Sequence, residues 1–348
     1  MEEKSRLGLR HAIPFLVGYS LIPIYLFAPT PWAVPLFIFV AIPLFDLILG
    51  KSTRNFLSDH IPAAFDLLVW LWPLVQVLNL SFALYRIAAG EITGPAILSH
   101  ALALGMINGA VGITYAHELI HRKSRAEVFL GEIILASVCY LHWRIEHVRG
   151  HHAHVATPED PASAPRGMSV YAFVPRSIAG AWVSVWKLEK ARLERKNKGP
   201  LAADSYLWPS LLVPGALAAA IGFGLGAAAM AAFLLQALVA VVLLEIVNYI
   251  EHYGLERTRL PSGNYERPHP GISWNADNRL TNAFLINLQR HSDHHARPRV
   301  PYPLLESRDE APQLPFGYAT MIIMSLVPPL YKRVVEPRIS PAGDSEPA

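Results

Sequence analysis

Six apolar stretches restrict this chain to a helical fold inside a lipid bilayer. An α-helix rises about 1.5 Å per residue, so about 20 apolar residues cross the roughly 30 Å of hydrocarbon. We expect membrane helices, paired into three hairpins, at residues 12–28, 32–49, 64–85, 95–116, 207–225 and 228–251. Only 16% of the residues are charged, whereas about a quarter is usual in soluble domains. The sequence therefore predicts an all-α integral membrane protein.

The distribution of positive charge predicts how these helices are oriented. All thirty lysines and arginines except Arg86 lie in residues 1–11, 50–63, 121–206 and 252–348. Segments rich in Lys and Arg remain in the cytoplasm, so both termini are expected there. Residues 117–206 and 252–338 would then form a cytoplasmic cap on a single membrane domain, residues 1–338. The polar tail 339–348 is expected to be disordered.

Nine of the fifteen histidines fall into four tight groups in or beside this cap. They are His117 and His121 in HELIH, His147, His151 and His152 in EHVRGHH, His252 in NYIEHYG, and His291, His294 and His295 in LQRHSDHH. Imidazole is a neutral ligand that suits iron, zinc, copper and nickel. Nine ligands are too many for one ion and suit two ions with four or five each. The sequence therefore predicts a membrane enzyme with a two-metal site.

The spacing within the groups suggests which rings act together. Residues four apart share a face of an α-helix, so His117 and His121 are expected to hold one ion together. His147 and His151 repeat this spacing, with His152 turned toward a neighbouring face. In the last group, His294 and His295 follow His291 by three and four residues, so all three can share one helix face.

Polar residues beside the groups are candidates to orient the rings, because a metal-bound histidine usually donates its other N–H to a carboxylate or carbonyl. The candidates are Glu118, Glu146, Asp160, Asn248, Glu251 and Asp293. For each acidic candidate, a carboxylate that is simply solvated at the protein surface is an equally good interpretation. Glu245 differs because it lies within an apolar stretch, where a carboxylate is costly and suggests function. It would serve the site from beneath or pair with a neighbouring helix.

Other features narrow the function. The single cysteine, Cys139, excludes intramolecular disulfides and cysteine-based metal sites. The net charge of +3 gives no reason to expect nucleic-acid binding. HELIH matches the H-E-x-x-H of zinc proteases, but a protease needs only one further protein ligand and leaves the other groups idle. A metal transporter with a histidine relay is another alternative.

The strings HELIHRK, EHVRGHHAHVATPEDPAS, NYIEHYGL and LQRHSDHHA together resemble the integral-membrane alkane 1-monooxygenases, which are related to membrane fatty-acid desaturases and hydroxylases. The resemblance extends from the first apolar stretch to near Arg338. It implies a non-haem di-iron enzyme of the bacterial cytoplasmic membrane, with the nine histidines as catalytic iron ligands. Such an enzyme uses O2 to convert medium- to long-chain n-alkanes into 1-alkanols. A fatty-acyl desaturase and an alkyl-aromatic, xylene-type hydroxylase remain alternatives.

The resemblance also implies partners. Two electrons would come from rubredoxin, which is reduced by an NADH-dependent reductase. Rubredoxin must be a separate protein, because its iron needs four cysteines and this chain has only Cys139. The basic stretch 187–198 is a candidate docking surface. The alkane would enter from the bilayer through a channel between helices, whose candidate floor residues are Phe45, Phe65, Trp70 and Trp72.

Overall fold

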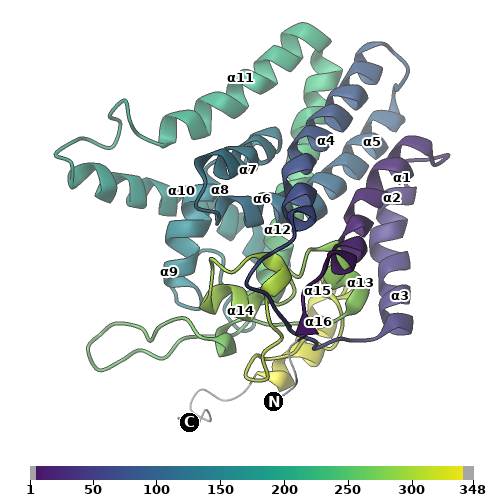
Figure 1. Cartoon of the computed structure of the whole chain (residues 1–348). Coiled ribbons are helices and arrows are strands. Elements are labelled where there is room, and N and C mark those ends of the chain that lie inside the picture. The colour runs from purple at the N-terminus through teal and green to yellow at the C-terminus, as the bar shows by residue number, and fades with distance from the viewer. Residues whose placement is uncertain (1–4, 340–348) are drawn as a thin grey trace.

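The computed structural model describes residues 5–339 and is built almost entirely of helices (Figure 1). Within this part, five continuous helical segments are long and apolar enough to cross a membrane. They are η1–α1 (Leu9–Phe27), α4 (Ala63–Ala88), α5–η3–α6 (Pro95–Ile120), α11 (Leu207–Leu225) and α12 (Ala227–His252). The predicted second span is an apolar but shorter helix, α2–η2–α3 (Ala33–Leu49). The prediction of an all-helical membrane protein is thus confirmed, with five spans where six were expected.

Several long segments contain turns of other helix types. The first span consists of the 3-10 helix η1 (Leu9–Ser20) and α1 (Leu21–Phe27). The short apolar helix is divided into α2 (Ala33–Leu36), the π-helical η2 (Phe37–Ala41) and α3 (Ile42–Leu49). The third span is divided into α5 (Pro95–Ile107), the π-helical η3 (Asn108–Ile113) and α6 (Thr114–Ile120).

Small residues bring the third and fifth spans into close contact. A Cβ atom added at Gly105 would lie 2.5 Å from Cβ of Val239, and one at Gly109 would lie 2.9 Å from Cα of Ala240. Glycines four residues apart permit such close approach of membrane helices. This packing matters for the site, because the two spans end at the histidine motifs that contain His117 and His252.

Helix α7 (Arg125–Ser137) packs against α4 and α6 and points into the bundle. Beyond its last residue the backbone turns at Cys139, where φ is 55°, and the chain returns to the histidine motif at residue 147. We call residues 125–146 the re-entrant segment. The second half of α7, from Gly131 to Ser137, is therefore packed inside the protein.

Side-chain amides form hydrogen bonds with the polar groups at the tip of the re-entrant segment. Gln76 donates to Oγ of Ser137 over 2.7 Å, and Gln236 donates to the Ser137 carbonyl over 2.8 Å. Asn108 in turn donates to Oε1 of Gln236 over 2.8 Å. Gln236 lies roughly 24 Å along α12 from His252. Non-helical backbone at such depth is tolerated only where its polar groups are satisfied inside the protein.

The remaining described elements form the histidine-bearing end. They are β1 (Ser5–Arg6), β2 (Phe56–Leu57), α8 (Trp143–Ile145), η4 (Glu146–His151), α9 (His152–His154), α10 (Val170–Glu194), η5 (Pro270–Ile272), α13 (Arg279–Phe284), α14 (His291–Ala296), η6 (Tyr302–Leu304), α15 (Tyr318–Ser325), α16 (Pro328–Val335) and η7 (Glu336–Arg338). The two strands pair in parallel. Figure 1 shows α9, α14 and α16 at the same end of the bundle. The tail 339–348, predicted to be disordered, lies outside the described residues except for Ile339.

Candidate metal centre

The fold brings all nine grouped histidines together in two clusters. Within each cluster, the candidate ligand atoms lie within 4.8 Å of one another. The five-histidine cluster comprises His117, His121, His147, His152 and His294. The four-histidine cluster comprises His151, His252, His291 and His295. The lone histidine of NYIEHYG is thus part of the site. HELIH contributes only two of five rings in its cluster, which does not match a three-ligand protease site.

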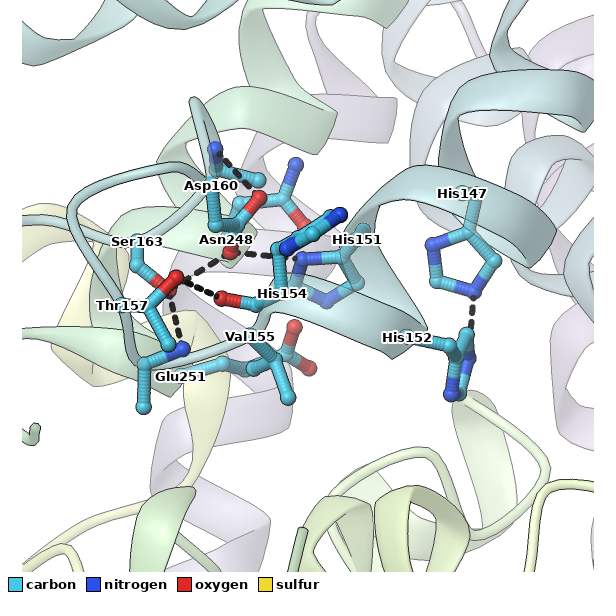
Figure 2. A network of polar contacts seen from close by, with 12 residues as sticks. His147, His151, His152, His154, Val155, Thr157, Asp160, Ser163, Asn248 and Glu251 are labelled. Carbon is cyan, nitrogen blue, oxygen red and sulfur yellow. Dashed lines mark hydrogen bonds and ion pairs between the residues drawn. The ribbon is translucent and has the colours of Figure 1, made fainter. Parts of the chain in front are cut away.

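The division between clusters differs from the helical spacing expected from the sequence. His147 and His151 fall in different clusters, because the chain from Glu146 to His151 is the π-helical turn η4. His147 instead meets His152, with 3.2 Å between their Nε2 atoms (Figure 2). His151 faces the other cluster, where its ring centroid lies 4.8 Å from that of His252. Inserted π-helical turns occur frequently at functional sites.

Helix α14 is also shared between the clusters. His291 and His295, four residues apart, bring their Nε2 atoms within 3.0 Å of each other. His294 points to the other cluster, where its Nε2 lies 3.0 Å from Nε2 of His117 and 3.0 Å from Nε2 of His152. One short helix therefore supplies both clusters and fixes their separation.

These distances fit metal coordination. Two ligands at right angles on an ion with bonds of about 2.1 Å are about 3.0 Å apart, which matches the nitrogen pairs above. In addition, Nε2 of His121, Nε2 of His151 and both ring nitrogens of His252 are buried without a hydrogen-bond partner. Burial, followed by repulsion between rings, holds the pKa of His294 and of His295 well below the usual value. This shift favours the neutral form of these two rings, which is the form that binds a metal.

Asp160 is placed to orient His151. Its Oδ2 lies 2.9 Å from Nδ1 of His151 and accepts a hydrogen bond from Oγ of Ser163 over 2.6 Å (Figure 2). Its Oδ1 accepts one from the backbone N–H of Ala162 over 3.0 Å. Burial acts to raise the pKa of Asp160, but the His151 and Ser163 interactions outweigh it and hold that pKa below its usual value. Asp160 is therefore ionised beside the ring.

Glu251 is the second carboxylate in contact with a clustered ring. Its Oε2 lies 3.2 Å from Nε2 of His291, and its Oε1 is buried with no hydrogen-bond partner. Glu146 is also buried, and burial followed by repulsion from Asp160 and Glu245 raises its pKa well above the usual value. The surroundings of the site thus shift the pKa values of Asp160 and Glu146 in opposite directions.

The other candidate residues have different partners. Glu118 pairs with Arg122 over 2.7 Å. Glu245 accepts hydrogen bonds from Tyr140 over 2.8 Å and from Asn248 over 3.1 Å. Of the two alternatives for this intramembrane carboxylate, the structure therefore shows pairing with neighbouring groups.

Asp293 contacts two arginines and the backbone near α14 rather than a histidine ring. It lies between His291 and His294 on α14 and pairs with Arg297 over 2.5 Å and Arg308 over 2.9 Å. Its Oδ2 also accepts the backbone N–H of Glu306 over 2.9 Å. These contacts hold α14 in place.

Arg257, which the sequence analysis did not single out, is a further positioning residue. It is buried and donates to the carbonyls of Ala153 and Val155, both over 2.7 Å, and of Glu266 over 2.9 Å. It thereby fixes the turn that follows His152. Two of these partners, Ala153 and Val155, lie more than 100 residues away in the sequence, so only its position shortly after a histidine motif signals a role.

A narrow apolar cavity of about 50 Å³ leads to the clusters. One end is formed by His117, His147, His291 and Glu251. Its wall follows one face of the third span through Thr114, Ile113, Ala110 and Gly109. The four aromatic residues expected at its floor do not line this cavity. Phe45 and Trp70 are exposed, whereas Phe65 and Trp72 are buried in the core.

Comparison with known proteins agrees with this site. Residues 93–324 match the fatty acid desaturase family. Alkane 1-monooxygenase 2 of Pseudomonas aeruginosa is 40% identical over 89% of this chain and 84% of its own. Alkane 1-monooxygenase 1 of the same species is 47% identical over 68% of this chain and 62% of its own. A more distant relative, the hydroxylase component of xylene/toluene monooxygenase of Pseudomonas putida, is 27% identical over 66% and 61%. The chain therefore belongs to the alkane 1-monooxygenase family within the fatty acid desaturases.

Proposed function

We propose that this protein uses O2 to oxidise the terminal carbon of medium- to long-chain n-alkanes, giving 1-alkanols. The observation that carries the proposal is the narrow apolar cavity that ends on rings of both histidine clusters. An alkane has no polar group to be recognised, so only the shape and apolarity of its site select it. The cavity offers both properties and directs the end of a chain toward His117, His147 and His291.

We infer that the nine histidines hold two iron ions, one in each cluster. Bound iron would supply the oxidising power needed to cleave a C–H bond that no acid, base or nucleophile attacks. Neutral imidazoles leave the positive charge of two ions uncompensated, so the nearby Asp160 and Glu251 stabilise the site electrostatically. Asp160 also fixes the orientation of His151.

The walls of the cavity position the substrate. Gly109 and Leu243 line it on two spans, each about 12 Å or more before the histidine of its own helix. An alkane would lie along this wall with its terminal methyl beside the histidines. The apolar lining excludes water from the reacting carbon, which limits side reactions.

We infer that electrons come from rubredoxin, a separate protein, through an NADH-dependent reductase. The basic residues between 187 and 198 on and after α10 are its proposed docking surface. We place the enzyme in the bacterial cytoplasmic membrane with both termini and the histidine clusters in the cytoplasm. The positive charges on the loops support this orientation.

The test is turnover by the purified full-length protein with rubredoxin, its reductase and NADH, across n-alkanes of increasing length. We expect alkane-dependent NADH oxidation and 1-alkanols carrying oxygen from labelled O2. Asp160→Asn should lower turnover, whereas Glu159→Gln, beside it but paired with the half-exposed His154, should not.

Two outcomes would assign a different reaction. Unsaturated product from an acyl substrate, without any from alkanes, would indicate a desaturase. Preferential hydroxylation of xylene would indicate the activity named for the more distant relative. The small volume of the cavity, about 50 Å³, favours an unbranched chain over an aromatic ring.

A further inference from the structure

A second concavity, with a volume of about 510 Å³, lies where the re-entrant segment leaves the end of α6. We call it the basic crevice. Its charged lining residues are Arg122, Lys123, Arg125, Arg144, Arg149 and Glu132. It is separate from the apolar cavity, and none of its charged residues contributes a ring or carboxylate to the histidine clusters.

Three of the five cations have no ion pair within the described residues. Arg122 pairs with Glu118 over 2.7 Å and with Asp66 over 3.2 Å. Arg144 pairs with Glu132 and lies 4.8 Å from the centre of the Tyr206 ring. Lys123, Arg125 and Arg149 are exposed, and no carboxylate of residues 5–339 neutralises them. The crevice therefore has an excess of positive charge.

The polarity of the crevice changes along α7. Arg125 begins the helix, and Val128 and Phe129 line the crevice one turn further on. From there α7 continues toward Ser137, which meets Gln76 and Gln236 inside the bundle. Phe129 is 60% exposed. Along α7 the unpaired Arg125 is thus followed by the apolar Val128 and Phe129, as a charged head group is followed by an acyl chain in a phospholipid. The charges of Glu132 and Arg144 further along neutralise each other.

We propose that the basic crevice binds the phosphate of an anionic phospholipid, with an acyl chain along Val128 and Phe129. Basic pockets at the ends of membrane helices recognise anionic head groups, and each cation near the surface strengthens such attraction about fivefold. An acidic protein would satisfy Lys123, Arg125 and Arg149 but would leave Phe129 against a polar surface. The lipid satisfies both kinds of lining residue.

The site would connect two parts of the metal centre. Arg122 and Lys123 directly follow His121, and Arg149 follows His147 by two residues. A phosphate held between these cations would join the end of α6 to η4. Lipid binding is therefore expected to raise the thermal stability of the full-length protein.

The experiment measures lipid retention and thermal stability of the purified full-length protein in nanodiscs that contain phosphatidylglycerol or phosphatidylcholine. Wild type should retain phosphatidylglycerol selectively. The triple variant K123Q/R125Q/R149Q should bind it at least about tenfold more weakly. The control K187Q/K190Q/K196Q removes the same charge from outside the crevice and should bind like wild type. Equal weakening in both variants, or no preference for the anionic lipid, would overturn the proposal.

Further arms separate the lipid from other ligands. Phe129→Ser should weaken binding of phosphatidylglycerol but not of glycerophosphate, which has no acyl chain. Inorganic phosphate that stabilises the protein as well as the lipid does would assign the site to the free anion. A triple variant that retains lipid but has a raised KM for an acidic electron carrier would assign it to a protein partner. Either result would show the lipid proposal to be wrong, independently of the substrate oxidised.

Discussion

His147 and His152 bring their Nε2 atoms within 3.2 Å of each other although five residues separate them along the chain. The π-helical turn η4 makes this possible, because its i to i+5 repeat places the two rings together. The same turn directs His151, only one residue earlier than His152, into the other cluster. A change of helix type thus lets one short motif supply both clusters.

This division predicts different effects for two double variants. His147→Ala with His152→Ala removes two rings from the five-histidine cluster and should lower the iron content to about one ion per chain. His147→Ala with His151→Ala removes one ring from each cluster and should change both iron environments. Iron content and Mössbauer spectra distinguish the two. Identical spectra for the two variants would contradict the division.

Asp160→Asn should weaken metal binding about 10- to 100-fold, as is usual when a group that orients a metal-bound ring is changed. Three donors approach this carboxylate, from His151, Ser163 and the backbone of Ala162. An amide has one oxygen and would face at least one donor with its own N–H groups. Chelator competition measures the change, and Glu159→Gln is the control. Equal metal release from both variants would assign no role to Asp160.

Gln236→Leu should destabilise the protein by about 1–3 kcal/mol for each polar group left without a partner. The affected groups are the Ser137 carbonyl and the Asn108 side-chain amide. Leu238→Ala, on the same helix but 56% exposed, is the control and should have little effect. Denaturant unfolding in detergent micelles measures both. The re-entrant tip would not depend on Gln236 if the two variants unfolded at the same denaturant concentration.

Ala110→Phe should shift substrate preference to shorter alkanes. Ala110 lines the apolar cavity about two helical turns from His117, so a larger side chain there shortens the available length. Met106→Phe introduces the same ring on the same helix away from the cavity lining and should leave the preference unchanged. Turnover across a series of alkanes tests this. If the Ala110→Phe variant still oxidised the longest alkanes, the alkane would have to bind outside this cavity.

The sequence was sufficient to predict the helical membrane fold and the convergence of nine histidines in one region, because hydropathy and ligand chemistry are both local properties. It could not predict how the histidines divide, since an α-helical spacing assigns His147 and His151 to one face. Nothing in residues 146–152 marks the π-helical turn. The helix Ala33–Leu49 lies where a span was expected at residues 32–49, but it is shorter than the five helices that are long enough to cross a membrane.

In the sequence the re-entrant segment is an apolar run interrupted by Glu132 and His142. Its interrupting residues contact partners elsewhere in the chain. Glu132 pairs with Arg144 and accepts a hydrogen bond from Tyr206, and the His142 ring stacks on Trp182 with 3.8 Å between the ring centroids. A linear pattern does not reveal these partners. It therefore does not decide whether residues 127–143 lie inside the protein or at the membrane interface.

The amides that complete the re-entrant tip set an order for biosynthesis. Ser137 leaves the ribosome 99 residues before Gln236, whose side-chain amide donates a hydrogen bond to its carbonyl. During translation the re-entrant tip can therefore complete its hydrogen bonds only after α12 has been synthesised. A helix from the C-terminal half of the chain thus completes the structure of a segment that was synthesised before it.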